Sequence, residues 1–220
     1  MRLLNKLLIL LVILMIPLVS ISASVNIITR MPDIYAYEFT RTQIMEKIGL
    51  DADADELSGL FSDYLTGSAS EFQITAEYQG REKDVFSPED QIGMQNVRKV
   101  LNAGLAAAIA MGVLSAAIVY YFIRLGHKER VRTAFRISVA LFIALWLAAV
   151  VTAATGAGMM LLQSGLFAGG FDAEGVLGLL LSGSFLKHWL IFSIVGSAVV
   201  MFIFGSVLFK FTKERRMFVV

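Results

Sequence analysis

Residues 101–123 read LNAGLAAAIAMGVLSAAIVYYFI, and none of these 23 side chains is charged. A helix needs about 20 apolar residues to cross the hydrocarbon of a bilayer. Residues 137–160 and 189–209 form two more uncharged runs that are long enough to do so. The three runs predict three transmembrane helices and place the chain among integral membrane proteins.

A fourth apolar run lies near the first residue, where Leu7 to Ile21 carries no charge and follows Arg2 and Lys6. The small residues from Ser20 to Ser24 also fit a cleavable signal peptide. We favour a retained anchor, and the signal peptide stays open as the alternative. With the anchor retained, we expect an all-α polytopic membrane protein of four transmembrane helices with a small α+β extracytoplasmic segment.

The composition agrees with lipid as the main solvent of the chain. Hydrophobic residues make up 57% of its 220 residues, and the mean hydropathy is +0.71. The formal net charge is only +1, so no nucleic acid partner is implied. The chain has no cysteine, which excludes disulfides, a thiol nucleophile and thiolate metal ligands. The predicted spans hold no ionisable residue, which disfavours a transporter.

Basic side chains indicate which ends of the predicted helices face the cytoplasm. Eleven of the 19 lysines and arginines, but only two of the 18 acids, fall in residues 1–6, 124–136 and 210–216. The positive-inside rule places these segments in the cytoplasm, together with both termini, and the remaining connections outside.

This orientation gives a predicted order of segments. They are a first transmembrane helix (1–24), an extracytoplasmic domain (25–98), a second transmembrane helix (99–124), a basic cytoplasmic loop (125–136), a third transmembrane helix (137–160), an outer interfacial or re-entrant loop (161–188), a fourth transmembrane helix (189–210) and a cytoplasmic tail (211–220).

The extracytoplasmic domain contains one helix signal and one strand signal. Residues 53–64, DADELSGLFSDY, begin with capping acids and place their apolar side chains on one stripe, with Gly67 as the stop. Residues 71–79, EFQITAEYQ, alternate apolar and polar side chains, which predicts a half-buried strand. The nearest candidate partner is the stretch from Asn26 to Tyr37, where Pro32 limits pairing to an edge or a short piece.

Two further elements are predicted near the membrane surface. Ser87 and Pro88 mark a helix start, and the absence of a later proline predicts one nearly continuous helix from Pro88 to Ile123. The glycine-rich stretch 163–187 is too short to span twice, so we expect an interfacial or re-entrant element there. Asp172 is a candidate cap for a short helix through Leu177 to Leu181.

Few residues on the predicted outer side offer chemistry. The two histidines of the chain are His127, in the cytoplasmic loop, and His188, at the outer end of the last span beside Trp189. A histidine at a membrane edge usually anchors the helix, but it can also accept a proton. The acidic run from Asp51 to Glu56 lacks the glycine and the distal glutamate of a calcium loop, so we expect a solvated helix start and no metal.

Several short motifs occur in order along the chain. Tyr35 and Tyr37 follow the first span, Asp63-Tyr64-Leu65-Thr66-Gly67 closes the acidic helix, and Val85-Phe86-Ser87 precedes Asn96-Val97-Arg98 at the start of the second span. This order resembles the bacterial lipoprotein intramolecular transacylase family and its uncharacterised integral-membrane relatives. The resemblance implies a protein of the bacterial cytoplasmic membrane that moves an acyl chain from glycerol to the terminal amine of a lipoprotein, at the outer face.

The histidines that carry this chemistry in the family are absent from the matching positions. Where the family usually has His-Met and then Asp-Val-Lys, this chain has Gly93-Met94 and then Asn96-Val97-Arg98, and Gln163 matches the second histidine. Neither glycine nor glutamine can act as a general acid or base. The resemblance therefore supports the fold and the location more strongly than the activity.

Two functions follow as hypotheses. An acyltransferase-like enzyme would use His188 as its titrating group, in a pocket with Gly93, Asn96, Arg98 and Gln163. A non-catalytic relative would bind lipid or lipoprotein N-termini, or scaffold a membrane partner. Neither function requires a cofactor or a metal, the expected partners are membrane lipid and lipoprotein N-termini, and the oligomeric state stays open.

Overall fold

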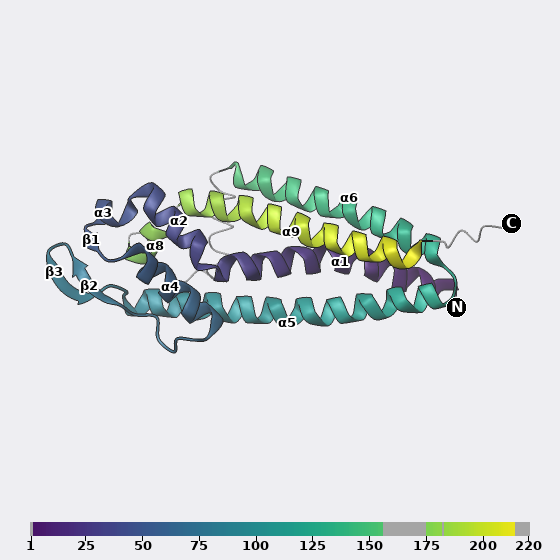
Figure 1. Cartoon of the computed structure of the whole chain (residues 1–220), viewed down its shortest axis with the longest axis horizontal. Helices are drawn as coiled ribbons and strands as arrows, with labels where there is room; N and C mark the ends of the chain where they lie inside the picture. The colour runs from purple at the N-terminus through teal and green to yellow at the C-terminus, as the bar shows by residue number, and fades with distance from the viewer. Residues whose placement is uncertain (1, 156–174, 182, 214–220) are drawn as a thin grey trace. The chain divides into compact units, whose positions relative to one another are not determined.

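The computed structural model describes residues 2–155, 175–181 and 183–213. Within these ranges four helices are long and apolar enough to cross a membrane, as the sequence predicts. They are α1 (Arg2–Arg30), α5 (Pro88–Arg124), α6 (Lys128–Ala153) and α9 (Gly183–Thr212) (Figure 1). The shorter elements are α2 (Pro32–Thr42), α3 (Ile44–Ile48), α4 (Ala54–Thr66), α8 (Val176–Leu180), β1 (Leu50–Asp51), β2 (Thr75–Tyr78) and β3 (Arg81–Asp84).

The chain divides into two compact units. We call the first the bundle unit; it comprises Met1–Ser24, Leu105–Ala149 and Ile194–Val220. We call the second the head unit; it comprises Val25–Gly104 and Val150–Ser193.

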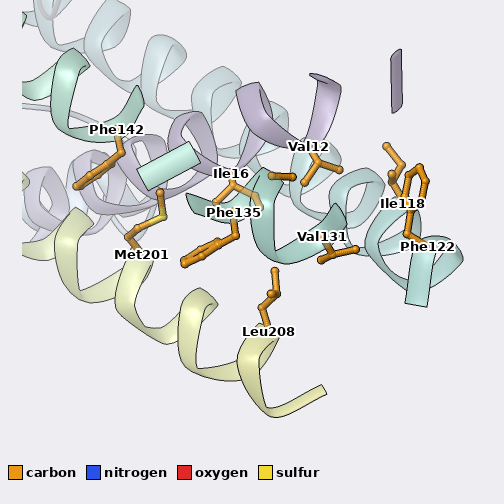
Figure 2. Close-up of a cluster of buried hydrophobic side chains, with 10 residues drawn as sticks. Val12, Ile16, Ile118, Phe122, Val131, Phe135, Phe142, Met201 and Leu208 are labelled. Atoms are coloured by element: carbon orange, nitrogen blue, oxygen red, sulfur yellow. The ribbon is translucent and has the colours of Figure 1, made fainter. Parts of the chain in front are cut away.

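The bundle unit has an apolar core to which all four long helices contribute. Figure 2 shows this cluster. Its buried members are Val12 and Ile16 from α1, Ile118 and Phe122 from α5, Val131, Ala134, Phe135 and Phe142 from α6, and Met201 and Leu208 from α9. Polar contacts also join α6 to α9 in this unit: the indole N–H of Trp146 donates to the hydroxyl of Ser197 at 2.9 Å, and Arg132 donates to the hydroxyl and the carbonyl of Thr212.

In the head unit, the stretch from Asn26 to Tyr37 is helical, so the prediction that it forms a strand partner is wrong. The first helix continues to Arg30, beyond the predicted limit at residue 24, and α2 begins at Pro32. Met31 between them is extended (φ −79°, ψ 124°), as expected for a residue that precedes proline. Proline thus separates two helices here, because it starts α2 where no amide donor is needed.

The predicted amphipathic helix of the head unit is confirmed as α4. Asp53 caps it by accepting a hydrogen bond from the amide of Asp55 at 2.8 Å, and Gly67 ends it in the left-handed conformation (φ 96°). The predicted apolar stripe packs against α2. Its residues Leu57, Phe61, Tyr64 and Leu65 are buried.

The strand predicted over 71–79 is shorter in the structure and has other partners than expected. β2 covers Thr75–Tyr78 and lies in the middle of a three-stranded antiparallel sheet with the order β1-β2-β3. It pairs with the adjacent β3 through a tight turn, which explains why a partner distant in the sequence is not needed. Phe72, at the start of the predicted strand, is buried outside the sheet.

The continuous helix predicted from Pro88 is confirmed as α5, which passes through Gly93 and Gly104 without a break. A reciprocal cap starts it, since the amide of Ser87 donates to Asp90 and the amide of Asp90 donates to the Ser87 hydroxyl, both at 3.1 Å.

The helices that contain the two later spans begin before the predicted spans do. α6 starts at Lys128, so most of the predicted loop 125–136 is helical, and α9 starts at Gly183, so His188 lies in its second turn. Hydropathy marks the part of a helix that fits hydrocarbon, whereas polar residues extend the helix beyond it. The short helix expected near residue 177 is α8, but its N-cap is Gly175; Asp172 lies outside the described residues.

Candidate functional site

His188 meets a carboxylate and a guanidinium from one helix. Glu38 and Arg41 lie three residues apart on α2, so that both side chains face the same side of this helix. Oε2 of Glu38 lies 2.9 Å from Nδ1 of His188. All three residues belong to the head unit.

The guanidinium of Arg41 lies against the imidazole of His188. Nη1 of Arg41 lies 2.5 Å from Nε2 of His188 and 3.2 Å from Nδ1. A guanidinium can only donate, so a ring nitrogen can only accept from it. The tautomer with its proton on Nδ1 lets the nearer nitrogen, Nε2, accept from Arg41 and turns the N–H towards Glu38.

The carboxylate of Glu38 is buried and poorly satisfied. Only 2% of its side chain is exposed, against 24% for His188. Nδ1 of His188 is close to it but not aligned as a hydrogen bond, and neither oxygen has a hydrogen bond within the residues that the structure describes. Buried polar groups are normally paired, so an exception of this kind indicates a role other than stability.

We expect Glu38→Met to stabilise the protein, because it replaces a buried, poorly paired carboxylate by an apolar side chain of similar length. Replacing a whole buried ion pair by apolar side chains is neutral or stabilising by about 1 to 4 kcal/mol, and here replacing the acid alone leaves no buried charge behind, because the remaining imidazole of His188 can be neutral. Thermal unfolding in detergent measures the change. The matched control Glu82→Met concerns an exposed residue of β3 and should change stability by less than about 0.5 kcal/mol. A lower unfolding temperature for Glu38→Met than for the control would contradict the expectation.

An apolar cavity lies next to this site. Tyr37 connects the two, since its ring centroid lies 5.9 Å from that of His188 and 6.2 Å from that of Phe192. The cavity has a volume of about 240 Å³ and is lined by Ile28, Met31, Asp33, Ile34, Tyr37 and Phe192. Five of these six side chains are apolar or aromatic, which suits a hydrocarbon chain.

Thr29 accepts hydrogen bonds that link the helices carrying the site. Its carbonyl accepts a hydrogen bond from the hydroxyl of Tyr35 at 2.6 Å, and its hydroxyl accepts one from the indole N–H of Trp189 at 2.9 Å. The carbonyl lies in the last turn of α1, where helix carbonyls lack partners within the helix. These bonds join the end of α1 to α2 and to α9, next to His188.

Burial raises the pKa of Tyr35 above its usual value of about 10. A raised pKa in the folded state means that the unfolded chain ionises first, so the stability gained from this group falls as the pH rises above about 10. We expect Tyr35→Phe to remove this alkaline dependence and to cost about 1 to 3 kcal/mol at neutral pH, because the Thr29 carbonyl loses its partner. Unfolding temperatures measured from pH 8 to 11 test this. An equal alkaline loss in both proteins would contradict it.

An aromatic cluster in the core of the head unit includes side chains of α2. Phe61 is at its centre, with ring centroids at 4.7 Å from Tyr35, 5.0 Å from Phe72 and 5.9 Å from Phe39. Phe185 of α9 stacks on the ring of Tyr35, with the two centroids 5.3 Å apart. The cluster holds α2 against α4 and α9, and so sets the position of Glu38 relative to His188.

The other residues predicted for the site lie on α5. Gly93 is buried in this helix and Asn96 is half-buried. The guanidinium of Arg98 stacks on the ring of Tyr64 at 5.2 Å. The contacts of His188 run to α2 instead, so the structure joins it to Glu38 and Arg41, while Gly93, Asn96 and Arg98 share a different helix. Gln163 lies outside the described residues.

Sequence reasoning missed Glu38 and Arg41. Both follow directly after the stretch from Asn26 to Tyr37, for which the sequence analysis considers a strand and no helix, so no helix face was predicted there. The signal that could have found them is the spacing Glu-x-x-Arg after a proline at a helix start.

Fold and site together define an integral membrane protein with a polar site of histidine and glutamate beside an apolar cavity. The family model of the lipoprotein intramolecular transacylase Lit matches residues 10–156. The chain therefore belongs to the Lit family. No protein with a curated description matches it.

Solved structures of the membrane-integral Lit from Bacillus cereus are similar in fold. A variant with one histidine replaced by alanine superposes with a TM-score of 0.71 at 16% identity, covering 97% of this chain and 96% of that one. A variant with arginine at a histidine position gives a TM-score of 0.70 at 16% identity, covering 97% and 94%. A third Bacillus cereus Lit structure gives 0.66 at 17% identity, covering 96% and 98%.

Proposed function

We propose that this protein transfers an acyl chain from an ester to the amine of a lipid-modified lipoprotein N-terminus, at the outer face of the cytoplasmic membrane. Membership of the Lit family supports the reaction class. The observation that carries the proposal is the imidazole of His188, held between the buried carboxylate of Glu38 and the guanidinium of Arg41 beside an apolar cavity.

The reaction needs one group that takes and returns a proton. The amine nitrogen attacks the ester carbonyl carbon, a C–N bond forms, and Nε2 of His188 takes a proton from the nitrogen. The C–O bond of the ester then breaks, and the same proton passes to the departing glyceryl oxygen. The products are an amide and a free hydroxyl group, and no co-reactant is used. General acid–base help of this kind contributes about 100- to 10,000-fold.

Glu38 and Arg41 have complementary parts in this step. The carboxylate faces Nδ1 and stabilises the imidazolium that forms when Nε2 takes the proton, as carboxylates do beside other catalytic histidines. Arg41 has to leave Nε2 before the base can act. Its guanidinium is then close enough to stabilise the negative charge that develops on the carbonyl oxygen.

The cavity beside Tyr37 supplies the binding site for the substrate. Its lining by Ile28, Met31, Ile34 and Phe192 suits the hydrocarbon of an acyl chain. A chain in this cavity would bring its ester end towards Tyr37 and His188. Membrane lipid and acylated lipoprotein N-termini are the proposed partners.

A non-catalytic role in binding lipid or lipoprotein is the second candidate. Two considerations favour it: Nη1 of Arg41 lies 2.5 Å from Nε2 of His188 and would have to move before a substrate amine could reach it, and the resemblance described in the sequence analysis predicts Gly93 and Gln163 at the positions where the family has histidines. The apolar cavity would serve such a protein equally well.

Mass spectrometry of lipoprotein N-termini separates the two functions. Cells that express the protein should contain lipoproteins whose amine carries an acyl chain and whose glyceryl group has lost one, and cells without it should not. Identical lipoprotein profiles in both cells would leave lipid or lipoprotein binding as the function.

The proposed sidedness can be tested with single cysteines, because the natural chain has none. A membrane-impermeant maleimide added to intact spheroplasts should label Ser68→Cys, which follows α4 in the head unit. It should not label Lys128→Cys, at the start of α6, until the membrane is permeabilised. Labelling of Lys128→Cys alone in intact spheroplasts would reverse the proposed topology.

A further inference from the structure

A second cavity lies in the bundle unit, where α1 and α6 begin. Its volume is about 700 Å³, and its lining includes Lys6, Ile9, His127, Arg130, Ala134 and Ile137. None of these residues takes part in the function proposed above, which rests on the head unit.

The lining changes from basic to apolar along both helices. On α1 it passes from Lys6 to Ile9, and on α6 from Arg130 through Ala134 to Ile137. A helix rises 1.5 Å per residue, so the change takes place over roughly 5 to 10 Å. This is about the distance from the phosphate of a lipid to its first chain carbons, and a small soluble anion would use only the basic end.

The charge of this cavity is positive. Its one acidic lining residue, Glu129, is paired with Arg132 at 2.8 Å, and Arg132 also donates to the carbonyl of Thr212 at 2.6 Å. Lys6 and Arg130 are exposed and line the cavity. The positive end of the α6 dipole adds to the same field, because α6 begins at Lys128.

We propose that this cavity binds one anionic phospholipid, with its phosphate between Lys6 and Arg130 and its first chain carbons along Ile9 and Ile137. The positive-inside prediction places the lipid in the cytoplasmic leaflet. The site is distinct from the one at His188 and does not depend on catalysis.

Native mass spectrometry of the full chain in a neutral detergent tests the proposal with phosphatidylglycerol as the probe. We expect one tightly bound phosphatidylglycerol and no equivalent binding of phosphatidylcholine, which has no net charge. Each basic residue beside an anionic lipid contributes a factor of about five, so the double variant Lys6→Gln/Arg130→Gln should bind it about 25-fold more weakly.

The matched control is the double variant Arg124→Gln/Arg136→Gln. It removes the same charge from two exposed residues, Arg124 in the last turn of α5 and Arg136 in the third turn of α6, neither of which lines the cavity. It should bind phosphatidylglycerol as the natural protein does. Unfolding temperatures of both variants confirm that they are folded.

Three outcomes would overturn the proposal. They are unchanged phosphatidylglycerol binding in Lys6→Gln/Arg130→Gln, an equal loss in the control, and displacement of the lipid by inorganic phosphate at the same concentration. The first two would show that the bound lipid is held by general charge or elsewhere, and the third that the site takes a free anion.

Discussion

Replacing His188 by glutamine should lower the rate of acyl transfer by about 100- to 10,000-fold, the usual contribution of a general acid–base group. Glutamine keeps polar atoms near Glu38 and Arg41 but cannot exchange a proton near neutral pH. The assay uses purified protein in detergent with a synthetic diacylglyceryl-cysteine peptide, and mass spectrometry measures the acyl-amide product.

Glu38→Gln should also lower the rate of acyl transfer, because the amide cannot stabilise an imidazolium as a carboxylate does. We expect kcat to fall while KM changes little, since Glu38 faces His188 and not the apolar cavity. The matched control is Lys187→Gln, an exposed neighbour of His188 on α9, which should keep full activity. Full activity in His188→Gln would remove His188 from the reaction.

Phe61→Ala should destabilise the protein by about 3 to 5 kcal/mol, the range for deleting a buried phenylalanine. The side chain is 0% exposed. It contacts one aromatic ring from α2, one from the segment before β2 and one from the segment after β3. Its removal leaves a cavity that rigid rings cannot fill by rotation. Denaturant or thermal unfolding in detergent measures the loss.

The control for this substitution is Ile92→Ala, at a side chain on α5 that is 57% exposed. It should change stability by less than about 0.5 kcal/mol. We also expect Phe61→Ala to slow acyl transfer, because α2 carries Glu38 and packs on α4. A loss of less than 1 kcal/mol for Phe61→Ala would show that the aromatic cluster repacks.

The spans and caps could be predicted from the sequence because each depends on local signals. Uncharged runs mark the part of a helix in hydrocarbon, and Ser87, Pro88 and Gly67 act on the residues beside them. Helix ends outside the hydrocarbon could not be predicted, since polar residues continue α6 and α9 beyond the apolar runs.

The site was only partly predictable. His188 stands out because the chain has two histidines and only this one falls on the predicted outer side. Its partners on α2 are about 150 residues away in the sequence, and a contact of that separation depends on tertiary packing that no local pattern contains. The helix α2, which begins at Pro32 and carries Glu38 and Arg41 on one face, was not predicted, because the stretch up to Tyr37 was considered as a strand partner.

The two tryptophans of the chain give each unit its own fluorophore. Trp146 donates to Ser197 within the bundle unit, and Trp189 donates to Thr29 within the head unit. In Trp146→Phe the remaining emission reports the head unit, and in Trp189→Phe it reports the bundle unit. Coinciding emission changes during denaturation would mean that the two units unfold as one cooperative block, and separate changes would reveal a state in which only one of them is folded.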